Sequence, residues 1–158
     1  MRAILIEVCM LLMLHAAAKA AGTADSSRVA QMLNDFHQAA AQAEGKRYFD
    51  HFAPEAVFLG TDAAERWTLA EFKAFAQPYF EQGKGWTYLV KSRHIYFSQD
   101  QNVAWFDEML ENESYGVCRG SGVLIKSDGV WKIAQYNLSI PIPIALAKQV
   151  VGMIREKK

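Results

Sequence analysis

The sequence lacks the patterns that mark several common kinds of functional site. It contains two cysteines, Cys9 and Cys118, which are not placed at the spacing of zinc ligands. There is no His-Glu-x-x-His segment, no glycine-rich phosphate loop opening a helix, and no Gly-x-Ser-x-Gly elbow. These absences argue against a zinc site, a nucleotide-phosphate site and a serine hydrolase, so we predict no metal and no cofactor.

The sequence also has no excess of charge of either sign. Lys and Arg together number 17, and Asp and Glu together number 17. A nucleic-acid surface or a polybasic membrane patch is therefore not favoured, and a small, roughly neutral partner is the better expectation. With 158 residues, of which 51% are hydrophobic, the chain is long enough for one domain with a substantial core.

The first twenty residues resemble a secretory signal peptide. Arg2 precedes a mostly apolar run, and Ala18-Lys19-Ala20 supplies small residues at a cleavage site. The run is too short for a stable membrane span. Glu7 interrupts it, which leaves open a frayed helix or a wrongly chosen start. We expect a secreted or periplasmic protein in which Cys118 is a buried structural residue without a disulfide partner.

The predicted organisation has four parts. Residues 1–20 form the signal peptide, 21–27 a linker, 28–143 the domain, and 144–158 a C-terminal helix with a cationic end.

The first half of the domain is predicted to be helical. Apolar residues recur at helical spacing from Val29 to Ala43, and a second short helix is expected over Lys46–Phe52, ended by Pro54. The histidines on these helices, His37 and His51, are expected at exposed or edge positions. A short strand over Ala56–Leu59 follows. A third helix then begins at the capping box of Thr68 and Glu71.

The second half is predicted to be a meander of four strands. Two strands cover residues 86–97 and 103–110, and residues 114–143 form a long hairpin that turns at Ser127-Asp128-Gly129. In the last arm, strict alternation would place Trp131, Ile133, Gln135 and Asn137 on the inner face and Tyr136 and Leu138 on the outer face. Helices followed by strands predict an α+β fold.

The pattern resembles the NTF2-like fold, and within it the SnoaL-like proteins of bacterial type. The residues that carry the resemblance are Phe49 to Phe58, Ala104-Trp105, Arg119 to Leu124, and Asp128 to Ile133 continuing to Ser139 and Pro141. The resemblance implies a cone in which N-terminal helices pack on a strongly curved antiparallel sheet around a pocket. It also implies a homodimer formed through the outer face of the sheet. The superfamily includes isomerases, cyclases, dehydratases and non-catalytic binding domains, so activity must be argued from the site.

Two adjacent carboxylates are the candidates for a general base. Asp107 and Glu108 point to opposite faces of a strand, so only one can face the pocket, where shielding by Trp105 or Phe106 would raise its pKa. An ion pair with Arg93 or Arg119 is the alternative interpretation of the same carboxylate.

The other candidate residues would bind a ligand in the pocket or at its mouth. They are Asp62, Arg66, Trp67, His94, Trp105, Arg119, Gln135 and Asn137. Three functions remain open at this point. The first is a small-molecule-binding domain. The second is an enzyme of isomerisation, cyclisation or dehydration that uses Asp107 or Glu108. The third is an assembly module.

Overall fold

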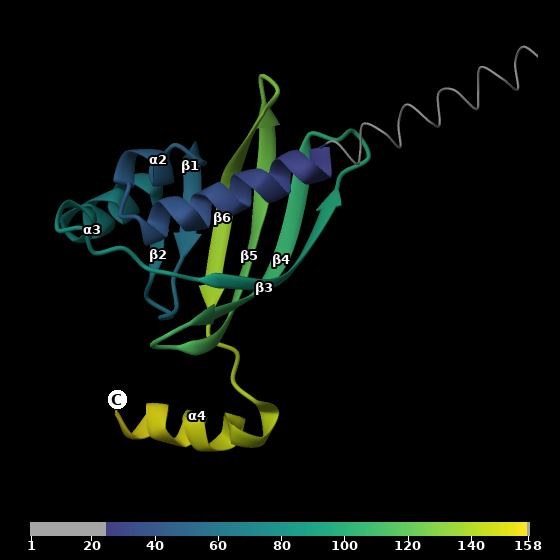
Figure 1. The fold of residues 1–158 in the computed structure, drawn as a ribbon. Coiled ribbons are helices and arrows are strands. Elements are labelled where there is room, and N and C mark those ends of the chain that lie inside the picture. Colours follow the sequence, from purple (N-terminus) through teal and green to yellow (C-terminus); the bar gives the residue numbers. More distant parts are fainter. Residues whose placement is uncertain (1–24, 158) are drawn as a thin grey trace, which may run out of the picture.

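The computed structural model describes residues 25–157, and its core is a six-stranded curved sheet. The elements are an N-terminal helix over residues 25–41, α2 (Gly45–Phe49), β1 (Phe52–Leu59), β2 (Arg66–Thr68), α3 (Leu69–Glu81), β3 (Leu89–Phe97), β4 (Val103–Asn112), β5 (Gly116–Ser127), β6 (Val130–Ser139), η1 (Ile144–Leu146) and α4 (Ala147–Glu156). The strand order is β2-β1-β6-β5-β4-β3 (Figure 1). All neighbours are antiparallel except β1 and β6, which run parallel. The predicted α+β cone is confirmed.

The N-terminal helix lies across one face of the sheet, in front of β6, β5 and β4 (Figure 1). Its buried side carries Val29, Leu33, Phe36 and Ala40, at the spacing of one helix face. The Phe36 ring lies 5.1 Å from that of Tyr136 on β6. The face of the sheet under this helix is therefore the inner, packed face, and the opposite face is called the outer face below.

Two local signals in the sequence fix the ends of elements as predicted. The turn between β5 and β6 holds Asp128 at φ 50° and Gly129 at φ 78°, which matches the positive angles expected of an Asp-Gly hairpin turn. At the start of α3, the Glu71 amide donates to Thr68 Oγ1 over 3.3 Å and the Thr68 amide donates to Glu71 Oε2 over 2.8 Å. This capping box sets the position of α3 against β1 and β2.

The boundary between the second helix and the first strand differs from the prediction. The helix ends at Phe49, and Phe52 already begins β1, where it pairs with Ile133 of β6. Pro54 lies within the strand and is exposed. The extended conformation is maintained because parallel pairing with β6 outweighs the helical pattern of the aromatic residues.

The predicted faces of β6 are wrong beyond Ile133. Leu124 of β5 pairs with Ile133, whereas the preceding Val123 pairs with Gln135, so Ala134 is an extra residue in a β-bulge. The bulge shifts the alternation by one position. Tyr136 and Leu138 therefore join Trp131 and Ile133 on the inner face, and Gln135 and Asn137 point outward.

Helix α4 lies apart from the body of the domain (Figure 1). It follows the segment Ile140-Pro141-Ile142-Pro143 and the short η1, and none of its residues is buried. The predicted signal peptide, residues 1–20, lies outside the described residues, as does most of the predicted linker.

Candidate functional site

A cleft lined mainly by aromatic side chains is a candidate site of the domain. Its cavity volume is about 210 Å³. It lies between β1, β2, α3, the segment before β3, the β4–β5 turn and the end of β6. Its lining residues are Phe58, Gly60, Thr61, Glu65, Trp67, Phe72, Phe75, Trp86, Tyr88, Tyr115 and Leu138. We call this cavity the aromatic cleft.

The local sequence explains how one wall of the aromatic cleft forms. Trp67 of β2 pairs with Phe58 of β1, and their rings stack with centroids 6.2 Å apart. Because the capping box starts α3 directly after β2, the first turns of the helix bring Phe72 and Phe75 against the same indole. Their ring centroids lie 5.6 Å and 4.8 Å from that of Trp67, both stacked. The result is a set of nearly parallel rings with an exposed edge.

Few polar groups line the aromatic cleft. Glu65 is its charged residue, and its Oε2 accepts the Asp62 amide over 3.1 Å while its backbone oxygen accepts the Gly60 amide over 2.9 Å. These bonds hold the β1–β2 loop closed around the carboxylate. On the opposite wall, burial raises the pKa of Tyr88 to about 12, so this phenol is a neutral hydrogen-bonding group at pH 7. The aromatic lining therefore includes one carboxylate that can accept a hydrogen bond and a neutral phenol hydroxyl.

The carboxylate of Glu108 is fully buried and lies in a separate hydrogen-bond network. Its Oε1 accepts from His37 Nε2 over 2.7 Å and from the Tyr136 hydroxyl over 3.0 Å, and its Oε2 accepts from Arg93 Nε over 2.7 Å. The Arg93 side chain continues to the Ala30 carbonyl at 3.1 Å and to Asn34 Oδ1 at 2.7 Å. This network joins β3, β4 and β6 to the N-terminal helix.

The electrostatics of the network favour an ionised Glu108. Burial raises the pKa of Glu108, but hydrogen bonds and charges from His37 and Arg93 outweigh it, and the net result is a lowered pKa. Burial, assisted by the Glu108 charge, holds the pKa of Tyr136 well above its ordinary value. Tyr136 is therefore a neutral donor to an ionised carboxylate. Glycine is required opposite them, because a Cβ at Gly120 would lie 2.4 Å from the Tyr136 hydroxyl oxygen.

Glu108 and Asp107 do not meet the geometric condition for a general base in the cavity. Glu108 has no exposed surface and does not line the aromatic cleft. Asp107 lies on the outer face, where it is exposed and contacts His94 Nδ1 at 3.3 Å. The alternative interpretation, a carboxylate in an ion pair with Arg93, applies to Glu108. The prediction that His37 is an exposed or edge residue is wrong, because it is buried against Glu108. Sequence reasoning also missed Tyr136 as an inner residue.

Most of the other predicted ligand residues lie together on the outer face. Paired positions across the strands form two neighbouring rows, Tyr96, Trp105, Val123 and Gln135, and then His94, Asp107, Ser121 and Asn137. Arg119 lies on the same face, next to Met109 and Ser139. The predicted inward positions of Gln135, Asn137 and Arg119 are therefore wrong, because the bulge and the strand register turn them toward solvent.

The remaining three predicted residues belong to the β1–β2 region. Trp67 lines the aromatic cleft and is half-buried, whereas Asp62 and Arg66 are exposed. Asp62 caps its own loop by accepting the Ala64 amide over 2.8 Å. Of the predicted ligand residues, only Trp67 is part of the cleft wall.

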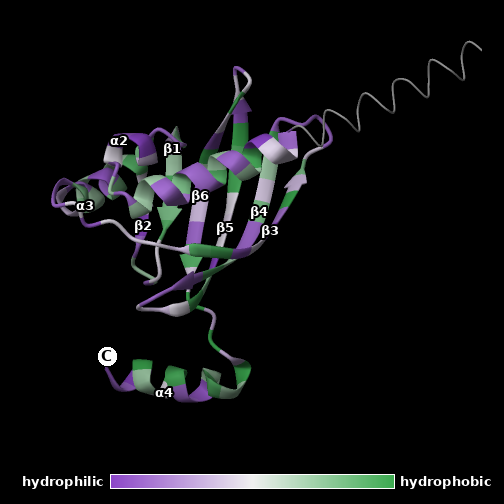
Figure 2. Ribbon diagram, in the orientation of Figure 1, coloured by the Kyte–Doolittle hydropathy of each residue, from purple (hydrophilic) through white to green (hydrophobic). Residues whose placement is uncertain are grey.

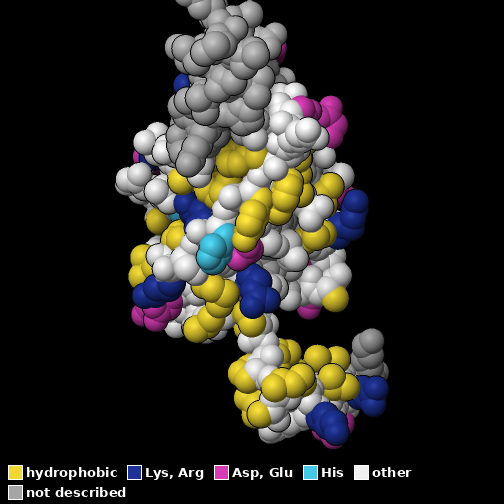
Figure 3. Space-filling model, turned by 90° about the vertical axis from the view of Figure 1, so that its right-hand side faces the viewer, with side chains coloured by type: hydrophobic (Ala, Val, Ile, Leu, Met, Phe, Trp, Pro, Cys, Tyr) yellow, Lys and Arg dark blue, Asp and Glu magenta, His cyan; other side chains and the backbone are white. Residues whose placement is uncertain are grey.

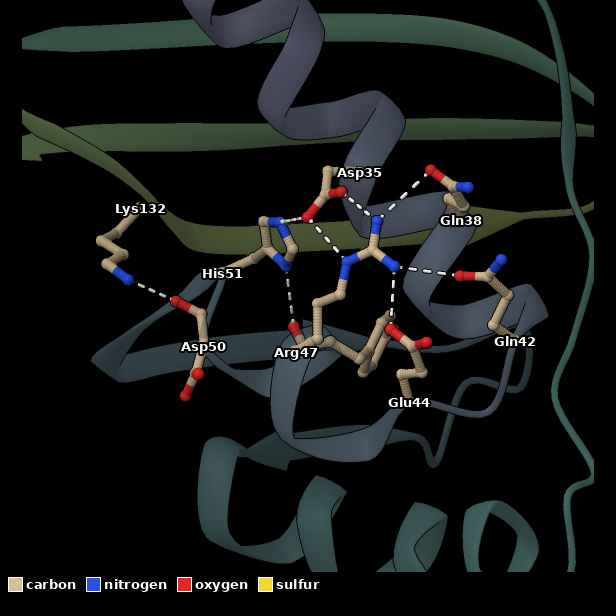
Figure 4. Close-up of polar contacts among 9 residues, drawn as sticks. Asp35, Gln38, Gln42, Glu44, Arg47, Asp50, His51 and Lys132 are labelled. Atoms are coloured by element: carbon tan, nitrogen blue, oxygen red, sulfur yellow. Dashed lines mark hydrogen bonds and ion pairs between the residues drawn. The ribbon is translucent and has the colours of Figure 1, made fainter.

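A polar cluster on the surface next to α2 has a structural explanation (Figure 4). The Arg47 guanidinium donates to Asp35 through Nε and Nη2, to Gln38 through Nη2, and to Gln42 and Glu44 through Nη1. His51 Nε2 contacts the same Asp35 at 3.0 Å. All five N–H groups of Arg47 are thus engaged. The cluster ties α2 to the N-terminal helix and leaves no guanidinium donor for a ligand.

The described part of the chain contains no cluster of three or more His, Cys, Asp or Glu side chains arranged to hold a metal. Within residues 25–157, no helix has the length and apolarity needed to cross a bilayer.

Comparison with known proteins identifies the family and the fold. A family model described as a SnoaL-like domain matches residues 29–143. No curated protein matches the sequence significantly. An NTF2-like protein of unknown function from Pseudomonas putida is 14% identical, with 77% of this chain and 90% of that one covered and a TM-score of 0.65.

Two similar structures belong to candidate dehydratases. An NTF2-like candidate dehydratase from Streptomyces avermitilis is 8% identical, with 77% and 99% of the two chains covered and a TM-score of 0.66. A candidate scytalone dehydratase from Novosphingobium aromaticivorans is 12% identical, with 78% and 89% covered and a TM-score of 0.64. At these identities the likeness establishes the fold alone.

Proposed function

Because the chain belongs to the SnoaL-like domain family, whose fold carries unrelated activities, we propose a function from its own cavity: the protein binds a small, flat, largely apolar molecule in the aromatic cleft. The observation that carries the proposal is the stack of Phe58, Trp67 and Phe75 along one wall, with Glu65 as the charged group. Binding sites for small molecules are typically apolar and aromatic, with few polar groups that orient the ligand.

The charge of the lining indicates which ligands suit the cleft. Glu65 disfavours an anionic ligand and can accept a hydrogen bond from a hydroxyl or amine. The Tyr88 and Tyr115 hydroxyls can donate to or accept from the same ligand. A phenol or a fused-ring alcohol has the required shape and polarity.

A binding function fits the site better than catalysis by Asp107 or Glu108. General base catalysis needs a carboxylate within about 3 Å, or one water, of the proton that it removes. Glu108 has both oxygens occupied inside the core, and Asp107 faces away from the cavity. The likeness to the two candidate dehydratases therefore supports the fold of this protein and does not support a dehydratase activity.

We also propose that the protein is exported and forms a homodimer, and each of these proposals has its own support. The N-terminal composition supports a signal peptide and hence a secreted or periplasmic location. The outer face exposes Tyr96 and Trp105 to 48% and 45%, which supports its use as a homodimer interface. Tyr136 and Leu138, predicted to lie on that outer face, are buried inside and do not contribute to it.

The experiment is a titration of the protein with 2-naphthol, followed by saturation-transfer NMR and by quenching of tryptophan fluorescence. We expect Phe75→Ala to weaken binding about tenfold, because one face of the cleft wall is lost, and about 1.4 kcal/mol corresponds to a factor of ten. Tyr79→Ala is the matched control. It lies one turn further along α3 with nearly equal exposure, 46% against 44%, but does not line the cleft. Equal affinities for wild type and Phe75→Ala would contradict the proposal.

A further inference from the structure

Helix α4 has an apolar face that none of the described residues, 25–157, buries. Ala147, Val150, Val151 and Ile154 recur at the spacing of one helix face, and Val151 and Ile154 are 45% and 53% exposed. Figure 3 shows hydrophobic side chains on the side of α4 turned toward the body and Lys and Arg side chains away from it. An isolated helix of ten residues is marginal in water, so a partner that covers this face would stabilise it.

The segment that leads to α4 extends the same apolar surface. Ile140, Ile142, Ile144 and Leu146 are exposed to 41%, 49%, 91% and 48%. The prolines between them favour an extended backbone, which carries α4 away from the end of β6. Figure 2 shows that hydrophobic residues occur in this segment and alternate with hydrophilic ones along α4.

The end of the body that faces α4 carries part of the lining of the aromatic cleft, and we call it the open end. The β1–β2 loop and the β4–β5 turn both lie at this end, above α4 in Figure 1. They supply Thr61, Glu65 and Tyr115 to the cleft, and Leu138 of the lining is two residues before Ile140. Tyr115 and Val117 are exposed there to 54% and 59%. Exposed apolar residues therefore lie both on the tail and on the end of the body above it.

The charges of the tail and the body are complementary. Residues 144–158 contain four basic residues and one acidic residue, a formal charge of +3, whereas residues 25–143 contain 11 basic and 15 acidic residues, a formal charge of −4. Asp62 and Glu65 of the β1–β2 loop and Glu113 of the β4–β5 turn lie at the open end, where the exposed Arg66 at the start of β2 offsets one of their charges. Lys148 and Arg155, seven residues apart, border the apolar face of α4.

From these observations we propose that α4 of one copy docks on the open end of a second copy and covers its aromatic cleft. The second copy offers an exposed apolar surface and an acidic rim, and it carries an identical tail, so the exchange is reciprocal and closes as a pair. The cleft alone has about 210 Å³, below the roughly 300–1,000 Å³ of typical ligand pockets. The partner's α4 would complete it. This inference rests on the proposed function for its purpose, but the contact itself does not require a ligand.

The test locates the tail by cross-linking in a Cys9→Ser background, with Cys118 buried. A tagged Thr61→Cys chain is mixed with an untagged Ile154→Cys chain and treated with a short bis-maleimide. We expect a covalent pair of tagged and untagged chains. Ser127→Cys replaces Thr61→Cys in the matched control, because the β5–β6 turn lies at the opposite end of the sheet (Figure 1). The expected yield in this control is about tenfold lower.

Three results would overturn the proposal. An intramolecular product in a Thr61→Cys, Ile154→Cys double variant, without covalent pairs, would make α4 a lid on its own domain. Equal yields with Ser127→Cys would make the contact non-specific. No product at all, together with sedimentation of the wild type on vesicles containing phosphatidylglycerol, would assign the tail to an anionic membrane surface.

The two proposals can fail separately. If cross-linked pairs form but 2-naphthol does not bind, the exchange of α4 is supported and the proposed ligand class is wrong. If 2-naphthol binding depends on Phe75 but no cross-linked pairs form, ligand binding in the aromatic cleft is supported and the exchange of α4 is wrong. If both hold, Val151→Asp with Ile154→Asp should weaken 2-naphthol binding about tenfold by uncovering the cleft, while the domain stays folded.

Discussion

The buried carboxylate of Glu108 should be a major determinant of stability, and Glu108→Gln tests this directly. The substitution keeps the size of the side chain but removes the charge and places an NH₂ group or a neutral oxygen opposite Arg93 Nε, now 2.7 Å from Glu108 Oε2. The side chains of Glu108 and Arg93 are 0% and 9% exposed. Removing one partner of a buried ion pair typically costs about 3–5 kcal/mol.

We expect a loss of about 3 kcal/mol, at the lower end of that range because glutamine can still accept from His37 and Tyr136. For a domain of this size, that corresponds to a fall in Tm of roughly 6–12 °C. Urea denaturation followed by tryptophan fluorescence measures the change in the free energy of unfolding. Asp107→Asn is the neighbouring control. Its ion pair with His94 is more than half exposed on both sides, so it should cost less than about 0.5 kcal/mol.

The difference between wild type and Glu108→Gln should also depend on pH. The pKa of Glu108 is lowered in the folded protein, so the wild-type advantage is present above the unfolded carboxyl pKa of about 4.3 and is lost as the pH falls through the folded value. The two unfolding free energies should therefore converge below about pH 4. A loss below 1 kcal/mol, an equal loss in Asp107→Asn, or a difference that stays constant from pH 7 to pH 3 would refute the reasoning.

Two further substitutions test the packing that positions the network and the cleft. Gly120→Ala should lower the free energy of unfolding by about 1–3 kcal/mol, because the new Cβ would lie 2.4 Å from the Tyr136 hydroxyl oxygen and 2.8 Å from Glu108 Oε1. Gly152→Ala in α4 is the control and should cause no loss, because no atom lies within 4 Å of the new Cβ. Thermal unfolding compares the two variants. Thr68→Ala should lower the free energy of unfolding by about 1 kcal/mol, because it removes the capping box of α3, and it should also weaken 2-naphthol binding. Thr68→Ser should restore both the stability and the binding. Unchanged stability in Thr68→Ala would show that β2 alone fixes the start of the helix.

The sequence predicted the fold where local chemistry decides it. The Asp128-Gly129 turn and the capping box of Thr68 and Glu71 each depend on residues within a few positions of one another, and both formed as expected. The exact strand faces depend on pairing with distant residues. Alternation in β6 failed at Ala134 because Val123 and Leu124 of another strand determine where the bulge forms.

A signal for that bulge was nevertheless present. Trp131 and Ile133 are apolar at odd positions, and Tyr136 and Leu138 are apolar at even positions, with Gln135 and Asn137 between them. If every large apolar residue is placed inside, the alternation must shift once between Ile133 and Tyr136. The assumption of strict alternation concealed this, and it placed two amides in a cavity that they do not line.

The choice between Asp107 and Glu108 had no comparable signal. Each shares its strand face with bulky apolar residues, Trp105 and Met109 for the first and Phe106 and Leu110 for the second. The burial of Glu108 depends on His37, 71 positions away, and on Arg93, 15 positions away. Partners at such separations are set by the topology, so the sequence supplied the right pair of carboxylates but not their environments.

The overall charge balance used in the prediction about partners does not show how the charges are distributed along the chain. Equal numbers of acidic and basic residues argue against a strongly charged surface only where the two kinds of residue are mixed along the chain. They are separated, with +3 on residues 144–158 and −4 on residues 25–143. Because the positive segment is also the amphipathic one and stands apart from the negative body, the balance of the whole chain is better understood as complementarity between two of its parts. Two copies can satisfy that complementarity in each other, which is the arrangement the cross-linking experiment distinguishes from a lid or a membrane contact.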